Sequence, residues 1–447
     1  MKTKSEKHFL YCAAGNYLGS LFSAFGSRNY KIFTFGQVIS NIGFLMEYIA
    51  ISWLVYRLTN SAVYVGLLFF ISGTTVCLSS AFAGVLADRI QTYKIIYLIN
   101  IVSAITSMTL GLSVFFGVSN IWFIFLTQVI AGLVRGIDGP VRSIYVKELI
   151  EKPEHLVNAI TLNSSMFNLA KIIGPAIAAV LIPLIGEWIC ICINSLSYVA
   201  VIIALSIMNH KELLKISRHD GIIKDLKEGF SYTFSYSPVR TTILFTSLIG
   251  LIGFSVNVIL PVYTKQVLGG DANVLGFMTT YSGIGALSAA LYLAGRKNAY
   301  GLDFVMFWSS ALYAICFIGL GFIHNFSIAA VVMVINGFGQ VLIFASANSL
   351  LQTVSDHSKT GRVIGLYFLL FNIATTIGNL AYGKLTDFVG SSSSLIMMGA
   401  GSLMVSIVFG FQLKKIRRKS LKKFITIGLK PVDLRTNSWF LSRTRTV

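Results

Sequence analysis

The stretch that decides the fold is Phe167-Asn168-Leu169-Ala170-Lys171-Ile172-Ile173-Gly174, because it returns 204 residues later as Phe371-Asn372-Ile373-Ala374-Thr375-Thr376-Ile377-Gly378. A repeat of this length predicts a duplicated half. Three shorter pairs recur in the same order: Gly43-Phe44-x-x-Glu47 with Gly253-Phe254-x-x-Asn257, Gly66-x5-Ser72-Gly73 with Gly276-x5-Ser282-Gly283, and Val129-Ile130-x-Gly132 with Val334-Ile335-x-Gly337. Together they predict two similar halves.

Composition places this repeat in a membrane protein. Apolar residues make up 55% of the 447 residues, charged residues only 12%, and the mean hydropathy is +0.75. These values lie outside the range of ordinary soluble domains. Apolar stretches of about 20 residues, long enough to span a bilayer as helix, recur near 32–56, 63–83, 95–117, 121–141, 157–184, 188–208, 241–262, 274–293, 303–323, 326–350, 363–383 and 391–411.

Two sets of six spans predict an all-α membrane protein with twelve transmembrane helices in two pseudo-symmetric six-helix bundles, an architecture typical of transporters. The predicted segments are a cytoplasmic or interfacial N-terminal segment 1–31, an N-terminal bundle 32–208, a cytoplasmic linker 209–240, a C-terminal bundle 241–411 and a basic cytoplasmic tail 412–447. The sequence has no Gly-x4-Gly-Lys-Ser/Thr loop for nucleotide phosphates. We therefore do not expect ATP to be the direct energy source.

The basic residues orient the chain, because Lys and Arg beside short loops stay on the cytoplasmic side. Placing both termini inside puts 31 of the 36 Lys and Arg residues on that side. The others are Arg57, Arg135, Lys171, Lys265 and Lys384. The net charge of +19 therefore indicates membrane topology rather than nucleic-acid binding. The basic tail can also contact anionic lipid.

Residues 9–25 are apolar after a basic start, as in a signal peptide or an additional span. A thirteenth span would place the basic tail outside, so we expect an interfacial or disordered segment instead. The five cysteines and six histidines show no metal or redox spacing. We expect them to be packing residues, and we expect no metal or cofactor.

Three ionisable residues lie inside spans of the first half, namely Glu47, Arg135 and Lys171. An ionisable group near the bilayer centre costs on the order of 3 kcal/mol on insertion scales and usually has a function. The repeat aligns these positions with neutral residues of the second half: Asn257, Gln340 and Thr375. The first half therefore holds the candidates for proton coupling.

Glu47 and Lys171 can lie at the same depth, each roughly 21 to 22 Å from the cytoplasmic end of its span at about 1.5 Å per residue. A pair between them would either tune the carboxyl for proton exchange or hold the first and fifth spans together. Arg135 should lie nearer the cytoplasm. It would either influence Glu47 through water or substrate, or pair with Asp138 on its own helix.

Gly84-Val85-Leu86-Ala87-Asp88-Arg89, between the second and third spans, resembles the loop signature of the major facilitator superfamily. Other segments resemble the branch of bacterial macrolide-efflux proteins and the enterobactin exporter: Ser52-Trp53-Leu54-Val55-Tyr56, Arg135-x-x-Asp138-x-Pro140-x-Arg142, Leu156-Val157-Asn158-Ala159-Ile160 and Arg362-Val363-x-Gly365. The resemblance implies a cytoplasmic gate. In that gate the loop Asp contacts a helix end of the other half, and a following base bonds an acid on the fourth span.

The gate residues that the resemblance implies are Gly84, Asp88, Arg89, Lys94, Asp138 and Arg142. The family usually carries a run of bases after Asp-Arg, whereas this chain has Gln91-Thr92-Tyr93 before Lys94. The partner of Asp138 must therefore be Arg89, Lys94 or Arg142.

Gly174-Pro175 resembles the Gly-Pro motif of the family's exporters, and it can serve a functional bend or simple close packing. Gly383-Lys384-Leu385-Thr386-Asp387 looks like a second loop signature on the outer side, where we expect a surface pair of Lys384 with Asp387. The candidates for the substrate cavity are Gln37, Asn41, Asn257 and Gln340.

The sequence and its resemblance thus predict a secondary transporter of the bacterial inner membrane that exports an amphipathic drug or siderophore-like metabolite in exchange for protons, by alternating access. Uptake, or lysophospholipid transport, on the same scaffold stays open. An enzyme is disfavoured because the spans hold no His, Cys or paired-carboxylate constellation. A receptor is disfavoured because no soluble stretch exceeds about 40 residues. The expected partners of this expected monomer are a small molecule, protons and the lipid bilayer, without nucleic acid, and any outer-membrane or periplasmic export partner is undetermined.

Overall fold

The protein is a bundle of long helices in a computed structural model that describes residues 23–150, 152–209, 230–296, 301–356 and 359–426. No strand occurs within these ranges. In this part of the chain, twelve helical segments are long and apolar enough to cross a membrane. The twelve predicted spans are therefore confirmed, whereas the predicted N-terminal segment lies mostly outside the described residues.

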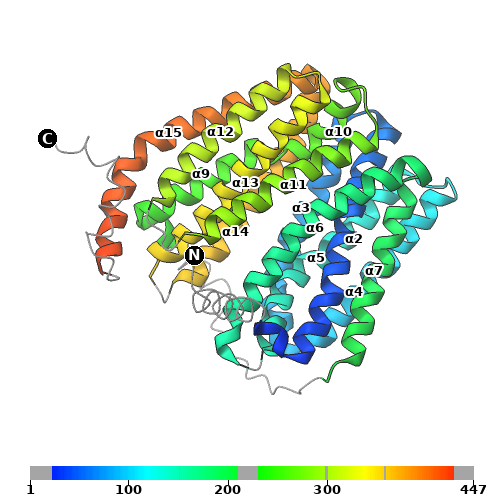
Figure 1. Cartoon of the computed structure of the whole chain (residues 1–447), viewed down its shortest axis with the longest axis horizontal. Coiled ribbons are helices and arrows are strands. Elements are labelled where there is room, and N and C mark those ends of the chain that lie inside the picture. The colour runs from blue at the N-terminus through cyan, green and yellow to red at the C-terminus, as the bar shows by residue number, and fades with distance from the viewer. Residues whose placement is uncertain (1–22, 151, 210–229, 297–300, 357–358, 427–447) are drawn as a thin grey trace, which may run out of the picture.

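The helices form two sets of six spans (Figure 1). After the 3-10 turn Ser23–Gly26, the first set comprises α2 (Arg28–Thr59), α3 (Ala62–Arg89), α4 (Thr92–Phe115), α5 (Ile121–Leu149), α6 (Leu156–Ile185) and α7 (Glu187–Ile207). The second set comprises α9 (Ser237–Gly253) with α10 (Val256–Gln266), then α11 (Ala272–Ala294), α12 (Leu302–Phe322), α13 (Phe326–Val354), α14 (Thr360–Val389) and α15 (Ser391–Thr426). We call them the N bundle and the C bundle.

The repeated glycines make equivalent contacts in the two bundles. Gly132 of α5 approaches the backbone oxygen of Ser72 on α3, and its repeat partner Gly337 of α13 approaches that of Ser282 on α11. A side chain at either glycine would collide with that oxygen, so each glycine permits close helix packing. The duplication read from the sequence is therefore present in the packing as well.

The seventh span is broken, although the sequence predicts a continuous helix. The chain forms a turn at Phe254 and Ser255 between α9 and α10. Pro261 in α10 has no backbone N–H, so it cannot donate to the carbonyl of Asn257 one turn earlier. Interrupted helices with free backbone groups are a common way to build sites at mid-membrane depth.

The two bundles meet at one end and separate at the other. The separated end is the one at which α7 finishes and α9 begins, which we call the linker end (Figure 1). At the opposite end, a Cβ on Gly66 of α3 would lie 2.6 Å from the backbone oxygen of Asn379 on α14. At the linker end of the same helix, a Cβ on Gly84 would have no atom within 4 Å. The space between the bundles is therefore closed at the opposite end and open at the linker end.

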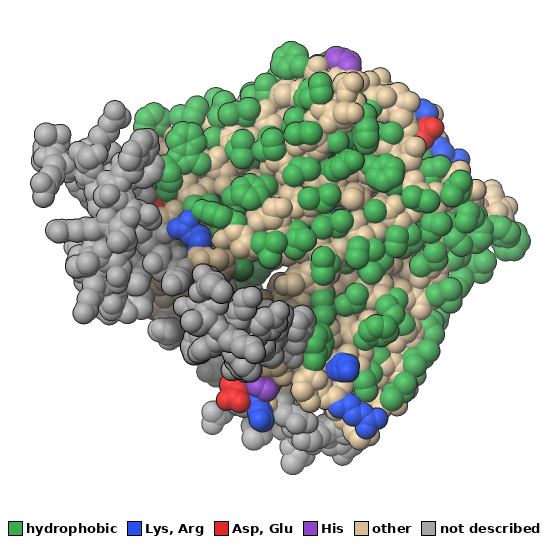
Figure 2. Space-filling model, viewed as in Figure 1, with side chains coloured by type: hydrophobic (Ala, Val, Ile, Leu, Met, Phe, Trp, Pro, Cys, Tyr) green, Lys and Arg blue, Asp and Glu red, His purple; other side chains and the backbone are tan. Residues whose placement is uncertain are grey.

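Helices α6 and α11 show the same asymmetry as α3 and α14, because they too are in contact away from the linker end. Gly276 of α11 lies against the backbone of Pro175 on α6, and the hydroxyl of Thr280 donates to the carbonyl of Ile172 at 3.5 Å. These residues belong to the halves of α6 and α11 that lie away from the linker end. On the face seen in Figure 2, hydrophobic side chains are spread over both bundles, as a surface against lipid requires.

Candidate functional site

Glu47, in the middle of α2, lies buried inside the N bundle with 8% of its surface exposed. Its carboxylate accepts a hydrogen bond from the hydroxyl of Ser107 on α4 at 2.9 Å and another from the side-chain amide of Asn194 on α7. Both partners are neutral. The carboxyl is therefore held in place without an ion pair.

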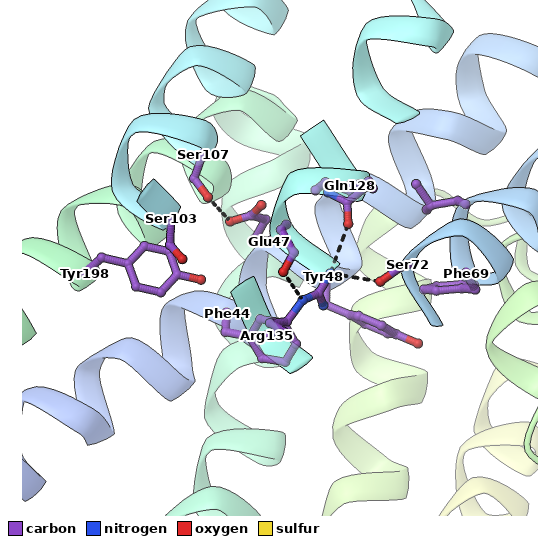
Figure 3. Close-up of a pocket in the computed structure, with 13 residues that line it drawn as sticks. Phe44, Glu47, Tyr48, Phe69, Ser72, Ser103, Ser107, Gln128, Arg135 and Tyr198 are labelled. Atoms are coloured by element: carbon purple, nitrogen blue, oxygen red, sulfur yellow. Dashed lines mark hydrogen bonds between the residues drawn. The ribbon is translucent and has the colours of Figure 1, made fainter. Parts of the chain in front are cut away.

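Arg135 on α5 faces the same pocket as Glu47 (Figure 3). Its guanidinium donates to the hydroxyl of Ser72 at 2.9 Å and to the side-chain oxygen of Gln128 at 3.2 Å. It also lies 5.3 Å from the ring centroid of Phe44. A cation over an aromatic face is electrostatically favourable, so Arg135 keeps its place in the apolar interior without an acidic contact.

The pocket between Glu47 and Arg135 has a volume of about 50 Å³. A pocket volume on the order of 10 to 15 Å³ is already enough to hold one water molecule. Polar groups around the pocket, including Ser103 and Tyr198, can hydrogen-bond to water (Figure 3). The geometry therefore allows water to join the carboxyl and the guanidinium, which is one of the two alternatives that the sequence left open for Arg135.

A larger cavity of about 760 Å³ lies between the two bundles. Phe44 and Tyr48 of α2 line both this central cavity and the Glu47 pocket. The two spaces are therefore separated by one layer of aromatic side chains. The lining of the central cavity extends to Asn163 and Ser164 of α6, toward the linker end.

Three of the four residues expected in the substrate cavity line it, namely Asn41, Asn257 and Gln340. Gln37 is not among the lining residues, and its side-chain amide donates to Asn41 at 3.2 Å. It therefore supports a lining residue from one helical turn away. Asn257 reaches the cavity from the start of α10, just after the break in the seventh span.

The expected pair of Glu47 with Lys171 is not formed. Lys171 lines the central cavity, where its ammonium lies 5.3 Å from the ring centroid of Phe167. Glu47 instead lies behind Phe44, with Ser107 and Asn194. Equal depth in two helices does not fix the direction in which side chains point, and these two point into different spaces.

The expected alternative for Arg135, a pair with Asp138, is also wrong, because Asp138 forms an ion pair with Arg142 one turn along α5. Arg142 is thus the base that contacts Asp138. Arg89 is an exposed residue at the end of α3, and the ammonium of Lys94 lies 5.8 Å from the ring centroid of Tyr93. Asp88 lies in the last turn of α3, near the open surface around Gly84.

Gly174 and Pro175 lie within the continuous helix α6. A Cβ on Gly174 would lie 2.8 Å from the side chain of Leu45 on α2. Pro175 lacks the N–H that would bond the carbonyl of Lys171, and a Cβ on Gly283 of α11 would lie 2.7 Å from that carbonyl oxygen. The motif thus brings α6 close to a helix of each bundle.

Asp387, near the end of α14, does not form the expected surface pair with Lys384. Its carboxylate accepts hydrogen bonds from the backbone N–H of Ala62 at 2.6 Å and of Val63 at 3.2 Å, and from the hydroxyl of Ser61. These groups begin α3 in the other bundle. We call this contact the Asp387 cap, because an acid at a helix N-terminus satisfies free N–H groups and opposes the helix dipole.

The sequence analysis identified Glu47 but did not identify its donors, Ser107 and Asn194. Serine and asparagine are common in transmembrane helices, and their spacing carries no signal across different helices. The signal for the Asp387 cap was the motif Gly383-Lys384-Leu385-Thr386-Asp387, because the loop signature that it resembles has an Asp that contacts a helix end of the other half.

The model of the family described as transmembrane secretion effector, MFS_3, matches residues 19–433. The chain belongs to this family of the major facilitator superfamily. It is 24% identical over 392 residues to the Staphyloferrin A transporter of Staphylococcus aureus, a match that covers 87% of this chain and 97% of that protein. It is 21% identical over 392 residues to Macrolide efflux protein A of Streptococcus pyogenes, a match that covers 87% of this chain and 96% of that protein. The family and its relatives are transporters, so the chain is a multi-pass membrane transporter and not an enzyme.

A solved structure shows the same fold as this transporter. The crystal structure of the nucleoside transporter NupG matches with a TM-score of 0.68 over 85% of this chain and 99% of that one, at 14% identity. The two six-helix bundles predicted from the repeat are therefore confirmed.

Proposed function

We propose that this transporter exports an amphipathic small molecule from the cytoplasm in exchange for protons, with Glu47 as the group that carries the proton. One observation carries the proposal: Glu47 is buried, held by two neutral donors, and separated from the central cavity only by Phe44 and Tyr48. The family description, with its word secretion, and the efflux protein among the relatives favour export.

A carboxyl held by neutral donors can gain or lose a proton without breaking an ion pair. When Glu47 is ionised, Ser107 and Asn194 stabilise the negative charge, and Arg135 faces the carboxylate across a pocket large enough for water. When Glu47 is protonated, the charge of Arg135 is left without compensation in the pocket. Protonation therefore changes which arrangement of α2, α4, α5 and α7 is most stable, and this is the requirement for coupling.

In this proposal the linker end faces the cytoplasm of a bacterial cell, with both termini on that side of the inner membrane. The distribution of Lys and Arg supports this orientation. The structure then has its cavity open to the cytoplasm and closed to the outside. This is the state that accepts a molecule for export.

Alternating access requires the closed end to open. The glycine contacts of α3 with α14, the contacts of α6 with α11, and the Asp387 cap must separate, while the linker ends of the helices come together. The open surface around Gly84 on α3, with Asp88 one turn further on, and the pair of Asp138 with Arg142 on α5 supply the gate residues for that second state. The Asp387 cap thus stabilises the state that is open to the cytoplasm.

The test follows protons in inside-out vesicles that hold a preformed pH gradient, acid inside. Amphipathic compounds are added one at a time, and proton release is followed with a pH-sensitive dye. We expect at least one compound to release protons through the wild-type transporter and none to do so through Glu47→Gln. Glu187→Gln is the matched control, because Glu187 is a buried acid of the same bundle that pairs with Arg57 outside the Glu47 pocket. Compound-evoked release through Glu47→Gln at the wild-type rate would reject Glu47 as the proton carrier.

A further inference from the structure

The central cavity has a one-sided charge. Two basic side chains line it, Arg142 and Lys171, and the described residues that line it include no Asp or Glu. Glu47, a buried acid of the N bundle, faces the separate pocket behind Phe44 and Tyr48. A ligand in the central cavity therefore meets positive charge and neutral polar groups.

The two bases differ in how far their charge is compensated. Arg142 forms an ion pair with Asp138 on its own helix. Lys171 contacts the ring of Phe167, and no acid among the described residues lies within ion-pair distance of it. A ring face stabilises an ammonium but does not neutralise it. The net positive charge of the cavity is therefore concentrated at Lys171.

The opposite wall of the cavity is aromatic and comes from the C bundle. Phe371 packs edge-on against Phe254 at 4.9 Å between ring centroids and lies 5.0 Å from Phe344. All three rings line the cavity. The cavity therefore offers a cation on α6 and an apolar surface on the other bundle, which suits a ligand with one anionic and one apolar part.

From this arrangement we infer that the transported molecule is an amphipathic anion, whose carboxylate or similar acidic group binds Lys171 and whose apolar part packs on Phe254, Phe344 and Phe371. The inference rests on the proposed function, because it names the substrate class of the same cavity. A volume of about 760 Å³ accommodates a molecule of drug size. Cationic amphiphiles are selected against, because they would place a second positive charge beside Lys171 with no acid to balance it.

The test measures binding with three probes that share a naphthalene ring and differ in charge: 2-naphthylacetate, 2-(2-naphthyl)ethanol and 2-(2-naphthyl)ethylamine. The purified full chain is placed in phosphatidylcholine nanodiscs, binding is measured by equilibrium dialysis, and binding to empty nanodiscs is subtracted. We expect the wild type to bind the acid about tenfold or more tightly than the alcohol, as one charge-assisted hydrogen bond would give, and to bind the amine most weakly.

Lys171→Met removes the charge and keeps the length of the side chain, so we expect it to bind the acid no more tightly than the alcohol. Lys171→Arg should keep the preference for the acid. Lys265→Met is the matched control, because Lys265 pairs with Asp271 at the opposite end and does not line the cavity. An amine that binds the wild type as tightly as the acid, or an unchanged acid preference in a folded Lys171→Met protein, would overturn the inference.

A competition arm separates two sources of the anion. Displacement of bound 2-naphthylacetate by lysophosphatidylglycerol identifies a lipid anion, and failure of displacement identifies a soluble metabolite; both support an anionic ligand. Binding in the absence of any gradient does not depend on proton coupling or direction. Failure of this test therefore leaves the proposed function standing, and loss of coupling in Glu47→Gln leaves the charge preference standing.

Discussion

Asp387→Ala should shift the balance between the two states of the transporter. In the structure, the Asp387 carboxylate accepts from two backbone N–H groups and one hydroxyl at the start of α3. Loss of an N-cap acid costs about 0.5 to 2 kcal/mol. Asp387 is exposed, which lowers its contribution, but it is charged and accepts from three donors, which raises it. We therefore use about 1 to 2 kcal/mol for this cap. Because the cap exists only when the opposite end is closed, this free energy is lost only from that state. We therefore expect the population open to the outside to rise about 5- to 30-fold.

Cysteine labelling measures this shift. Thr279→Cys places a thiol on the cavity wall, in the half of α11 that lies away from the linker end, and a membrane-impermeant maleimide is added to either face of sealed vesicles. Asp387→Ala should raise the rate of labelling from the outside by the same 5- to 30-fold. Asp271→Ala is the matched control, since Asp271 also precedes a helix at the opposite end but makes no capping hydrogen bond. Equal labelling rates in the wild type, Asp387→Ala and Asp271→Ala would refute the role of the cap.

Three further substitutions test the packing and the charges. Gly66→Leu should open or destabilise the contact of α3 with α14, because its side chain would meet the backbone of Asn379; an unchanged melting temperature and unchanged labelling from outside would contradict this. Gly84→Leu should leave the melting temperature unchanged, since nothing lies within 4 Å of a Cβ there. It should reduce transport in vesicles, because the added side chain would block closure of the linker end. Transport at the wild-type rate would rule out that closure. Arg135→Met should abolish gradient-driven transport. Arg135→Lys should keep part of it, because the positive charge facing Glu47 is retained. Equal transport by the two variants would show that this charge is not required.

The fold was predictable from the sequence because its signals are local and repeated. Apolar length determines where a helix can span, and the glycines of the repeat mark close approaches that recur in both bundles, as Gly132 and Gly337 do. The break at Phe254 and Ser255 was not predictable in this way, because its residues are as apolar as an unbroken span. Only the position of Pro261 pointed to it.

The site was predictable in its residues and not in its contacts. Glu47, Arg135 and Lys171 stood out because charge is costly in a membrane, whichever way the side chain points. The direction depends on helix rotation and on neighbours from other helices, so the sequence could not place Glu47 with Asn194 or Lys171 in the central cavity. Likewise, Asp387 reaches a helix more than 300 residues earlier in the chain. The motif that ends at Asp387 singled out this acid, but no local pattern names the helix that it caps.

The most direct test of Glu47 as the proton carrier compares uphill transport with exchange in the same proteoliposomes. With a compound that evokes proton release through the wild type as the probe, a pH gradient drives accumulation in one experiment, and equal concentrations on both sides allow exchange of labelled for unlabelled probe in the other. If Glu47 carries the proton, Glu47→Gln will lose accumulation and keep exchange, because the cavity and its alternation do not need the carboxylate to change its charge. Accumulation by Glu47→Gln to the wild-type level would contradict the account.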